Sequence, residues 1–336
     1  MNFGIIKKWL LVGGQDLVLE AADCLKKKSQ DFKIVTGQRN LDEVTNNGKK
    51  LIENFRSSKF SYHVSDDVNT DKFVQKYIDE NTILLSLSSP WIFKEKFINL
   101  FKGKSINLHE ANLPLNRGGA TLSWMIMMSQ KESASVLHFI TPKIDEGDIV
   151  SYCNYVFPSN CKIPDDYMNF ISKKSVSLIK DFIGKVISEN EFTIKLQNND
   201  ESSYWPRLNT EIQGFIDWNW DAKSIKKFID AFDSPYNGSR TFLKNKKVIL
   251  KKAFYSESKK FHPFQRGIIY KKHKGNIHIA CINGAIVVEE ITDENNNKIF
   301  NNLKLGERLH TPIDFIEKGL NFRPVYSSKG LEEKDV

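Results

Sequence analysis

Cysteine is scarce in this sequence of 336 residues, and a long hydrophobic run is missing. The four cysteines, Cys24, Cys153, Cys161 and Cys281, are far apart and form no Cys-x-x-Cys or Cys/His pair with zinc spacing, so we expect free thiols and no metal. No apolar stretch approaches the ~20 residues that a membrane helix needs. The short apolar stretch before Asp16 is typical of a first buried strand and not of a signal peptide, so we expect a cytoplasmic protein.

The chain has a net charge of +8, and its positive charge is concentrated in one segment. Between Arg240 and Lys274 there are twelve lysines and arginines, and Glu257 is the one acidic residue. Such a segment can bind the phosphates of a nucleotide or of RNA. It can equally be a set of solvated lysines on edge strands, which discourage association between sheets. The sequence leaves both interpretations open.

Short apolar runs alternate with helical patterns over residues 1–196. This alternation predicts an α/β domain with a mostly parallel, Rossmann-like sheet, whose ligands bind beyond the carboxyl ends of the strands. We expect strands at 9–13, 32–36, 82–87, 105–108, 135–140 and 149–157, and helices at 16–28, 93–101, 120–130 and within 164–187.

The pattern changes after a polar linker at residues 197–203. A helix is expected within 217–232, beginning at Asn219 or Asp221, because either side chain can cap free backbone N–H groups. Closely spaced strands at 241–243, 247–254, 267–272, 277–281 and 285–290 predict a smaller β-rich domain over 204–326, a barrel or a sandwich. Residues 327–336 are expected to form a mobile tail.

Residues 106–119 read INLHEANLPLNRGG and begin at the end of a predicted strand. Alternate side chains of a strand share a face, so Asn107 and His109 project together while Leu108 points into the core. Asn107 offers an amide donor, and His109 can donate, accept or carry a proton near neutral pH. Asp145 is our choice for the third polar group, with Gly147 allowing a tight turn that aims it at the sheet.

This trio includes no serine or cysteine nucleophile, which favours direct transfer of an acyl group to an incoming amine. Asn107 and His109 would stabilise the developing negative charge on oxygen, and His109 or Asp145 would receive the proton. A buried polar network that only packs the loop is the alternative, and spacing alone does not separate the two interpretations.

The runs NLHEANLPLNRGGATLSW (107–124) and HFITPKIDEGDIV (138–150) resemble the formyltransferases that use 10-formyltetrahydrofolate. Their Asn-x-His, Leu-Pro-x-x-Arg-Gly and Asp-x-Gly elements stand here in order and at matching spacing. The resemblance implies that Asn107, His109 and Asp145 are catalytic and that no metal is used. It also implies a folate site near two loops, formed by Ser86, Leu87, Ser88, Trp91, Ile92, Phe93, Ile140 and Lys143.

The second domain carries further parts of the resemblance in YWPRLN (204–209), GFIDW (214–218) and SPYNGS (234–239). These are similar to a C-terminal domain shared by tRNA and sugar formyltransferases, which implies an OB-like barrel. Where tRNA enzymes have Gly-Thr-Pro-x-Phe after the first strand and Ser-Leu-Leu-Pro after the histidine, this chain has GGQDL (13–17) and Ala111-Asn112-Leu113-Pro114. The pattern is more similar to enzymes that formylate nucleotide-linked amino sugars for surface polysaccharides such as O-antigen.

A sugar nucleotide presents a base for stacking and a diphosphate for an arginine fork. We therefore expect a dTDP-linked 4-amino-4,6-dideoxyhexose as acceptor, a homodimer, and no membrane or nucleic-acid partner. The expected acceptor-binding residues are Arg117, Gly118, Tyr204, Trp205, Arg207, Asn209 and Tyr236. Methionyl-tRNA formyltransferase activity is the alternative that the basic segment supports, and a folate or nucleotide sensor without catalysis is the second alternative.

Overall fold

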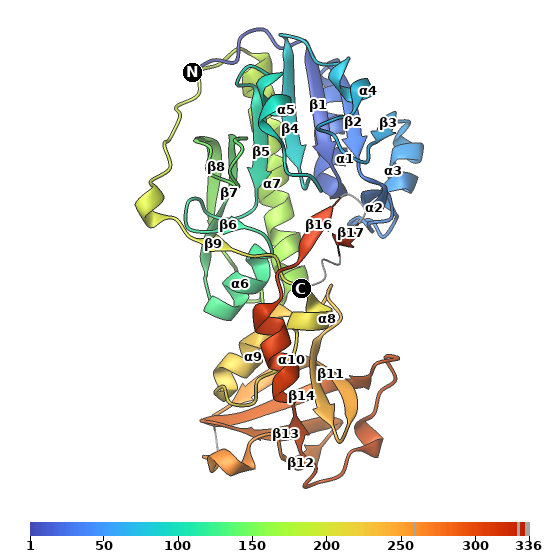
Figure 1. The fold of residues 1–336 in the computed structure, drawn as a ribbon, viewed down its shortest axis with the longest axis vertical. Coiled ribbons are helices and arrows are strands. Elements are labelled where there is room, and N and C mark those ends of the chain that lie inside the picture. Colours follow the sequence, from blue (N-terminus) through green and yellow to red (C-terminus); the bar gives the residue numbers. More distant parts are fainter. Residues whose placement is uncertain (258–259, 328–329, 333–336) are drawn as a thin grey trace.

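A computed structural model of the chain describes residues 1–257, 260–327 and 330–332. It forms an α/β domain followed by a β-rich domain (Figure 1). The α/β domain contains the helices α1 (Gln15–Lys27), α2 (Gln38–Leu41), α3 (Leu51–Ser58), α4 (Lys72–Gln75), α5 (Glu95–Asn99), α6 (Thr121–Met128) and α7 (Pro164–Ile187). Its strands are β1 (Lys8–Gly13), β2 (Asp31–Thr36), β3 (Tyr62–Val64), β4 (Thr82–Leu87), β5 (Ser105–His109), β6 (Arg117–Gly118), β7 (Glu132–Phe139) and β8 (Ile149–Val156).

Seven of these strands form one sheet in the order β3-β2-β1-β4-β5-β7-β8. The first five in this order run parallel, β7 is antiparallel to both of its neighbours, and β8 therefore runs in the same direction as the first five. Every residue of β4 is buried, as is typical of a central strand covered on both faces. The predicted Rossmann-like, mostly parallel sheet is confirmed, with β7 as its one reversed strand.

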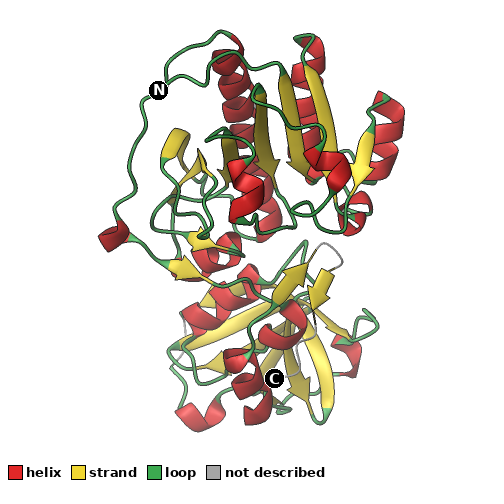
Figure 2. Cartoon of the chain, turned by 45° about the horizontal axis from the view of Figure 1, so that its top comes forward, coloured by secondary structure: helices red, strands yellow, loops and turns green. Residues whose placement is uncertain are grey.

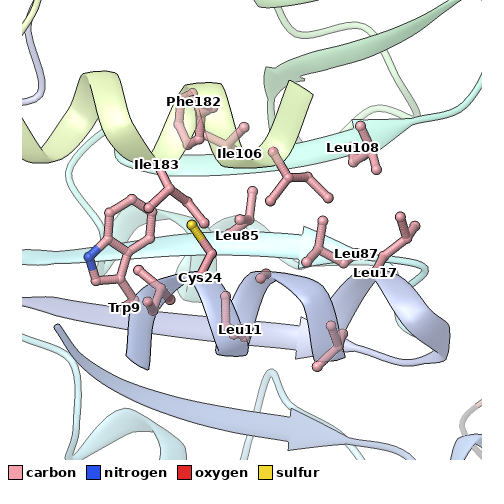
Figure 3. Close-up of a cluster of buried hydrophobic side chains, with 14 of the residues drawn as sticks. Trp9, Leu11, Leu17, Cys24, Leu85, Leu87, Ile106, Leu108, Phe182 and Ile183 are labelled. Atoms are coloured by element: carbon pink, nitrogen blue, oxygen red, sulfur yellow. The ribbon is translucent and has the colours of Figure 1, made fainter. Parts of the chain in front are cut away.

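Helices α1 and α7 cover one face of this sheet (Figure 3). Trp9 and Leu85 from the strands and Phe182 and Ile183 from α7 pack together there, each fully buried. The helix α7 begins with Pro164 at its first turn, where the missing N–H costs nothing. Its buried residues recur at helical spacing, which is why the sequence predicts this element so well.

The β-rich domain closes its sheet on itself. Its six strands follow the order β12-β13-β14-β11-β10-β15, and their bounds are β10 (Ser239–Leu243), β11 (Lys246–Ser256), β12 (Ile269–His273), β13 (Asn276–Cys281), β14 (Gly284–Asp293) and β15 (Leu309–His310). The two ends meet, because the Ile269 amide donates to the Glu307 carbonyl and the Leu309 amide to the Gly267 carbonyl, both at 2.8 Å. The expected small barrel is confirmed, and closure removes the exposed sheet edges.

Helix α9 (Ala222–Ala231) packs on this barrel from the side that faces the α/β domain (Figures 1 and 2). The Asp221 side chain caps it by accepting the Ser224 amide at 2.7 Å, which is one of the two capping positions that we predicted. The remaining elements are β9 (Tyr204–Trp205), α8 (Thr210–Gln213), α10 (Ile313–Asn321), β16 (Val325–Ser327), β17 (Gly330–Glu332) and the 3-10 turns at Asn199–Glu201, Pro263–Gln265 and Phe300–Asn302.

Several elements differ from the sequence prediction. Helix α5 is shorter than the predicted 93–101, and β7 begins three residues before the predicted strand. The described part of the expected mobile tail forms a hairpin of β16 and β17, and residues 328–329 and 333–336 lie outside the described residues. No helix in the described ranges combines the length and apolarity needed to cross a bilayer.

Candidate active site

A cleft of about 720 Å³ opens at the carboxyl ends of β4 and β5. This is the edge of a parallel sheet at which the chain leaves the core and ligands are expected. Asn107, His109 and Asp145 all line the cleft, so the structure brings the three predicted catalytic residues together.

The amide group of Asn107 is held from two sides. Its Oδ1 accepts a hydrogen bond from the Ser86 hydroxyl at 2.8 Å, and its Nδ2 lies 3.1 Å from Nε2 of His138. The His138 ring donates from Nδ1 to the Phe139 carbonyl at 2.9 Å, so Nε2 is the acceptor in the neutral ring. These bonds fix which end of the amide is the nitrogen, and they leave its second N–H for the cleft.

The imidazole of His109 is oriented by a backbone carbonyl. Its Nε2 lies 2.6 Å from the carbonyl oxygen of Asn116, which can only accept, so Nε2 carries a proton. Its Nδ1 lies 3.5 Å from Oδ2 of Asp145. Nδ1 is therefore the ring atom that can exchange a proton with a group in the cleft.

Asp145 is placed by an unusual backbone. The residue has a φ of 54°, in the left-handed region that aspartate tolerates better than most residues. Gly147 serves close approach, since a Cβ there would stand 1.8 Å from the Phe139 carbonyl oxygen. Gln197 secures the turn by donating from Nε2 to the carbonyls of Asp145 and Gly147, at 2.8 and 2.6 Å.

The Asp145 carboxylate stays ionised in this site. Burial would raise its pKa, but the neighbouring His109 and His138 and the Gly118 amide outweigh burial and hold the pKa well below its usual range. The Gly118 N–H donates to Oδ2 at 2.9 Å, and Nε2 of His138 lies 3.5 Å from Oδ1. A charged carboxylate beside His109 suits a residue that receives or relays a proton.

The Arg-Gly-Gly sequence is explained by tight packing of β6 against β9. Gly118 has a φ of 103°, and a Cβ on it would stand 2.2 Å from the Trp205 carbonyl oxygen. Only glycine fits both conditions. Gly119 makes room for Arg207, whose Cβ would lie 3.0 Å from a Cβ added there.

Arg117, which we expected at the acceptor site, is buried and bonded within the protein. Its guanidinium donates to Oε1 of Gln197 at 2.8 Å and to Oδ1 of Asn199 at 2.9 Å, and it lies 3.6 Å from a carboxylate oxygen of Glu146. These contacts tie the catalytic loop to the segment between the domains, and they account for this arginine without a ligand.

Most of the predicted folate residues line the cleft. Leu87 is buried in the core, away from the cleft, and Ile92 stands 68% exposed. An exposed apolar side chain beside backbone groups fits the flat, partly apolar ring system of a folate. The predicted residues that line the cleft are Ser86, Ser88, Trp91, Ile92, Phe93, Ile140 and Lys143.

Some of the predicted acceptor residues line the cleft, and the others make contacts within the protein. Gly118, Tyr204 and Arg207 line the cleft, and the Tyr204 side chain is 56% exposed. Trp205 packs against Trp124 at 5.4 Å between ring centroids. Asn209 caps α8, with its side chain accepting the Ile212 amide at 3.0 Å, and Tyr236 is not among the residues that line the cleft.

Sequence reasoning missed His138 and Gln197. His138 stands on β7 directly opposite Asn107, a pairing that becomes visible only once β7 is known to run antiparallel to β5. Gln197 was assigned to a linker because it lies in a polar run. Within the described residues, no three His, Cys, Asp or Glu side chains group as they would around a metal ion.

Two sequence families match the chain, one for each domain. The family described as "Formyl transferase" matches residues 15–157, and "Formyl transferase, C-terminal domain" matches residues 209–302. The methionyl-tRNA formyltransferase of Clostridium tetani is 24% identical over 67% of this chain and 70% of its own length. The bifunctional polymyxin resistance protein ArnA of Wigglesworthia glossinidia brevipalpis is 28% identical over 51% of this chain, and the match spans only 26% of that longer protein.

Solved structures share the fold across both domains. An N-formyltransferase from Helicobacter canadensis, in complex with folinic acid and dTDP-3-aminofucose, has a TM-score of 0.63 and 20% identity, covering 84% of this chain and 98% of that one. The sugar 3N-formyltransferase WlaRD, in the presence of dTDP and 5-N-formyl-THF, has a TM-score of 0.64 and 19% identity, covering 87% and 99%.

Proposed function

Because the chain belongs to the formyltransferase family, we propose that it transfers a formyl group from 10-formyltetrahydrofolate to the amine of a nucleotide-linked deoxyaminosugar. The acceptor is a dTDP-linked 4-amino-4,6-dideoxyhexose. The observation that carries the proposal is the cleft in which Asn107, His109 and Asp145 meet. It has the polar groups of acyl transfer to an amine and a wall that fits a folate.

The three residues divide the work of the transfer. 10-Formyltetrahydrofolate supplies the formyl group, which the acceptor amine takes with loss of one proton. The free N–H of Asn107 donates to the oxygen on which negative charge develops. Nδ1 of His109, beside the ionised Asp145, receives the amine proton and passes it to N10 of the folate as the bond between N10 and the formyl carbon breaks, so that tetrahydrofolate leaves.

The nucleotide sugar is supported by the cleft and by the neighbours. Tyr204 offers an exposed aromatic surface, and Arg207 extends over Gly119 into the cleft wall. Structural neighbours crystallised with dTDP or a dTDP-amino sugar align along nearly their whole length.

The basic segment gives weaker support to a tRNA acceptor than its charge suggests. Lys244, Lys247 and Lys252 form ion pairs with Glu307, Glu294 and Glu290, which all lie outside the segment. Arg240 is buried and bonded to Glu211. Part of the positive charge is thus neutralised within the protein.

The names of the sequence relatives keep methionyl-tRNA as the second acceptor to test. Binding to RNA through several phosphates would fall by roughly 0.7–0.9 log units per phosphate for each tenfold rise in salt, whereas a diphosphate gives a shallow slope. The salt dependence of the acceptor KM therefore separates the two.

The decisive experiment offers the enzyme and its folate donor a panel of dTDP-, UDP- and GDP-linked amino sugars and charged initiator tRNA. Mass spectrometry then shows which acceptor gains a formyl group. We expect a dTDP-4-amino sugar to be formylated; a formyl group found on tRNA alone would refute the proposal.

A pair of histidine variants completes this experiment. His109→Asn should abolish turnover while folate binding persists, and His310→Asn, at an exposed histidine of the barrel, should leave turnover unchanged. A protein that binds folate and nucleotide but transfers nothing would be a sensor.

A further inference from the structure

The C-terminal part of the chain returns to the catalytic cleft. The family match ends at residue 302, and α10 (Ile313–Asn321) follows it. From the end of α10 the chain leaves the barrel domain and runs to β16 beside the α/β domain (Figure 1). Arg323, Pro324 and Val325 form part of the cleft wall, together with the catalytic residues. A segment beyond the family match therefore contributes to this site.

Contacts with the barrel domain fix the path of this segment. The Phe315 ring packs between Phe215 and Phe242, with ring centroids 4.9 and 4.8 Å away. The Gln213 side chain donates to the carbonyls of Gly319 and Phe322, at 3.2 and 3.3 Å. These contacts fix α10 on the barrel domain, and α10 in turn positions Arg323 at the cleft.

Arg323 brings a positive charge to the cleft. Its Nη1 donates to the carbonyls of Leu320 and Phe322, at 2.8 and 3.0 Å, which holds the guanidinium group in place. In the described part of the chain it forms no ion pair with a carboxylate, and its Nε and Nη2 donors remain for a ligand. A guanidinium fork with donors to spare suits phosphate oxygens.

The other charged residues of the cleft also favour binding of a phosphate group. Arg207 lines the cleft, and Lys143, also in its wall, is compensated by Glu146 at 3.3 Å. The acidic residue of the cleft wall is Asp145, which accepts the Gly118 amide and lies 3.5 Å from ring nitrogens of His109 and His138. Among the residues that line the cleft, Lys143, Arg207 and Arg323 are basic and Asp145 is acidic, so the lining has an excess of positive charge.

We propose that Arg323 is an acceptor-binding residue, which contacts a phosphate of the acceptor's diphosphate in the cleft that Arg207 also lines. The inference rests on the proposed function, since it assigns a residue to the nucleotide of that acceptor. It also means that part of the acceptor specificity lies in a segment beyond the family match.

The test replaces Arg323 by Gln and by Lys and measures steady-state kinetics together with calorimetric binding of dTDP alone. We expect R323Q to raise the acceptor KM and the Kd of dTDP about tenfold, with kcat and the folate KM within twofold of the wild type. R323K should recover part of the loss, since it keeps the charge without the fork. Arg56→Gln, at an exposed arginine of α3, is the matched control and should change nothing.

Three outcomes of this test would overturn the inference about Arg323. A rise in the folate KM instead of the acceptor KM would assign Arg323 to the carboxylates of folate and overturn the inference. Unchanged dTDP binding by R323Q would also overturn it while leaving the proposed function intact. A wild-type protein that binds none of dTDP, UDP and GDP and formylates no nucleotide sugar would refute both.

Discussion

Replacement of Asp145 by Asn removes a charge from the centre of the cleft and keeps the shape of the side chain. The amide oxygen can still accept the Gly118 N–H, which lies 2.9 Å from the carboxylate in the wild type. What is lost is the negative charge 3.5 Å from Nδ1 of His109 and the capacity to receive a proton. The variant therefore isolates the electrostatic role of Asp145 from its packing.

We expect this variant to lose activity strongly and stability moderately. A positioned proton acceptor contributes about 10²–10⁴-fold, so kcat should fall by a factor in that range. Hydrogen bonds to a charged group contribute about 1.5–3 kcal/mol, and the variant keeps one neutral bond, so about 1–3 kcal/mol should be lost at pH 7. For a domain of this size that loss lowers Tm by about 2–10 °C.

The stability difference should depend on pH in one direction. The pKa of Asp145 is lowered in the folded state, so its contribution is present above the pKa of an unfolded aspartate, about 3.9, and is lost as pH falls through the lower folded value. The gap in Tm between wild type and D145N should therefore be full at pH 7 and shrink below about pH 4.

Formyl transfer followed by mass spectrometry and thermal unfolding followed by circular dichroism check these values. Asp181→Asn, at an exposed aspartate paired with Lys185 on α7, is the matched control, because such surface pairs contribute little. A D145N variant with kcat within threefold of the wild type would show that the reasoning about proton transfer is wrong.

Four further outcomes are expected. Ser86→Ala leaves Oδ1 of Asn107 without its donor and should lower kcat about fivefold with little change in Tm, as a bond of about 1 kcal/mol implies; equal kcat would speak against this orientation of the amide. Gly118→Ala places a methyl group 2.2 Å from the Trp205 carbonyl oxygen and should lower the free energy of unfolding by more than about 2 kcal/mol, measured by urea denaturation, whereas Gly119→Ala should cost less. Burial raises the pKa of Asp230 to about 6 despite its bond to Lys226, so the folded protein loses stability as pH rises through 6 and Asp230 ionises. Between pH 4 and 8 the free energy of unfolding of Asp230→Asn should therefore increase relative to that of the wild type by up to about 3 kcal/mol. A difference in Tm that stays constant over this range would contradict this. The acceptor amine must be neutral to attack, so kcat/KM should rise from pH 5 to 8, and a flat profile would refute the proton role of the site.

The sequence predicts the elements whose signals are local. Helix α7 is found because its apolar residues recur at helical spacing behind Pro164, and β4 because it is a continuous apolar run between polar residues. The capping aspartate of α9 is likewise a local signal. The trio was placed at one edge of the sheet because two of its members share a strand face and the third follows in a glycine turn.

The rest depends on contacts between distant residues. The strands β6 and β9 are two residues long, and neither has a pattern that reveals its partner. His138 acquires its neighbour Asn107 only from the register of β5 and β7. Arg323 lies 178 positions after Asp145 in the chain, and nothing near it in sequence indicates that the segment returns to the cleft.

The connection between the domains is hydrogen-bonded to the catalytic loop. Gln197 bonds the turn of Asp145, the Arg117 amide donates to the Ser203 carbonyl at 3.0 Å, and the Gly119 amide donates to the Trp205 carbonyl at 3.0 Å. A movement of residues 197–205 away from the α/β domain would have to break these bonds and displace the carboxylate of Asp145 with them. Residues 197–205 are therefore held as part of the catalytic site and do not act as a hinge between the domains.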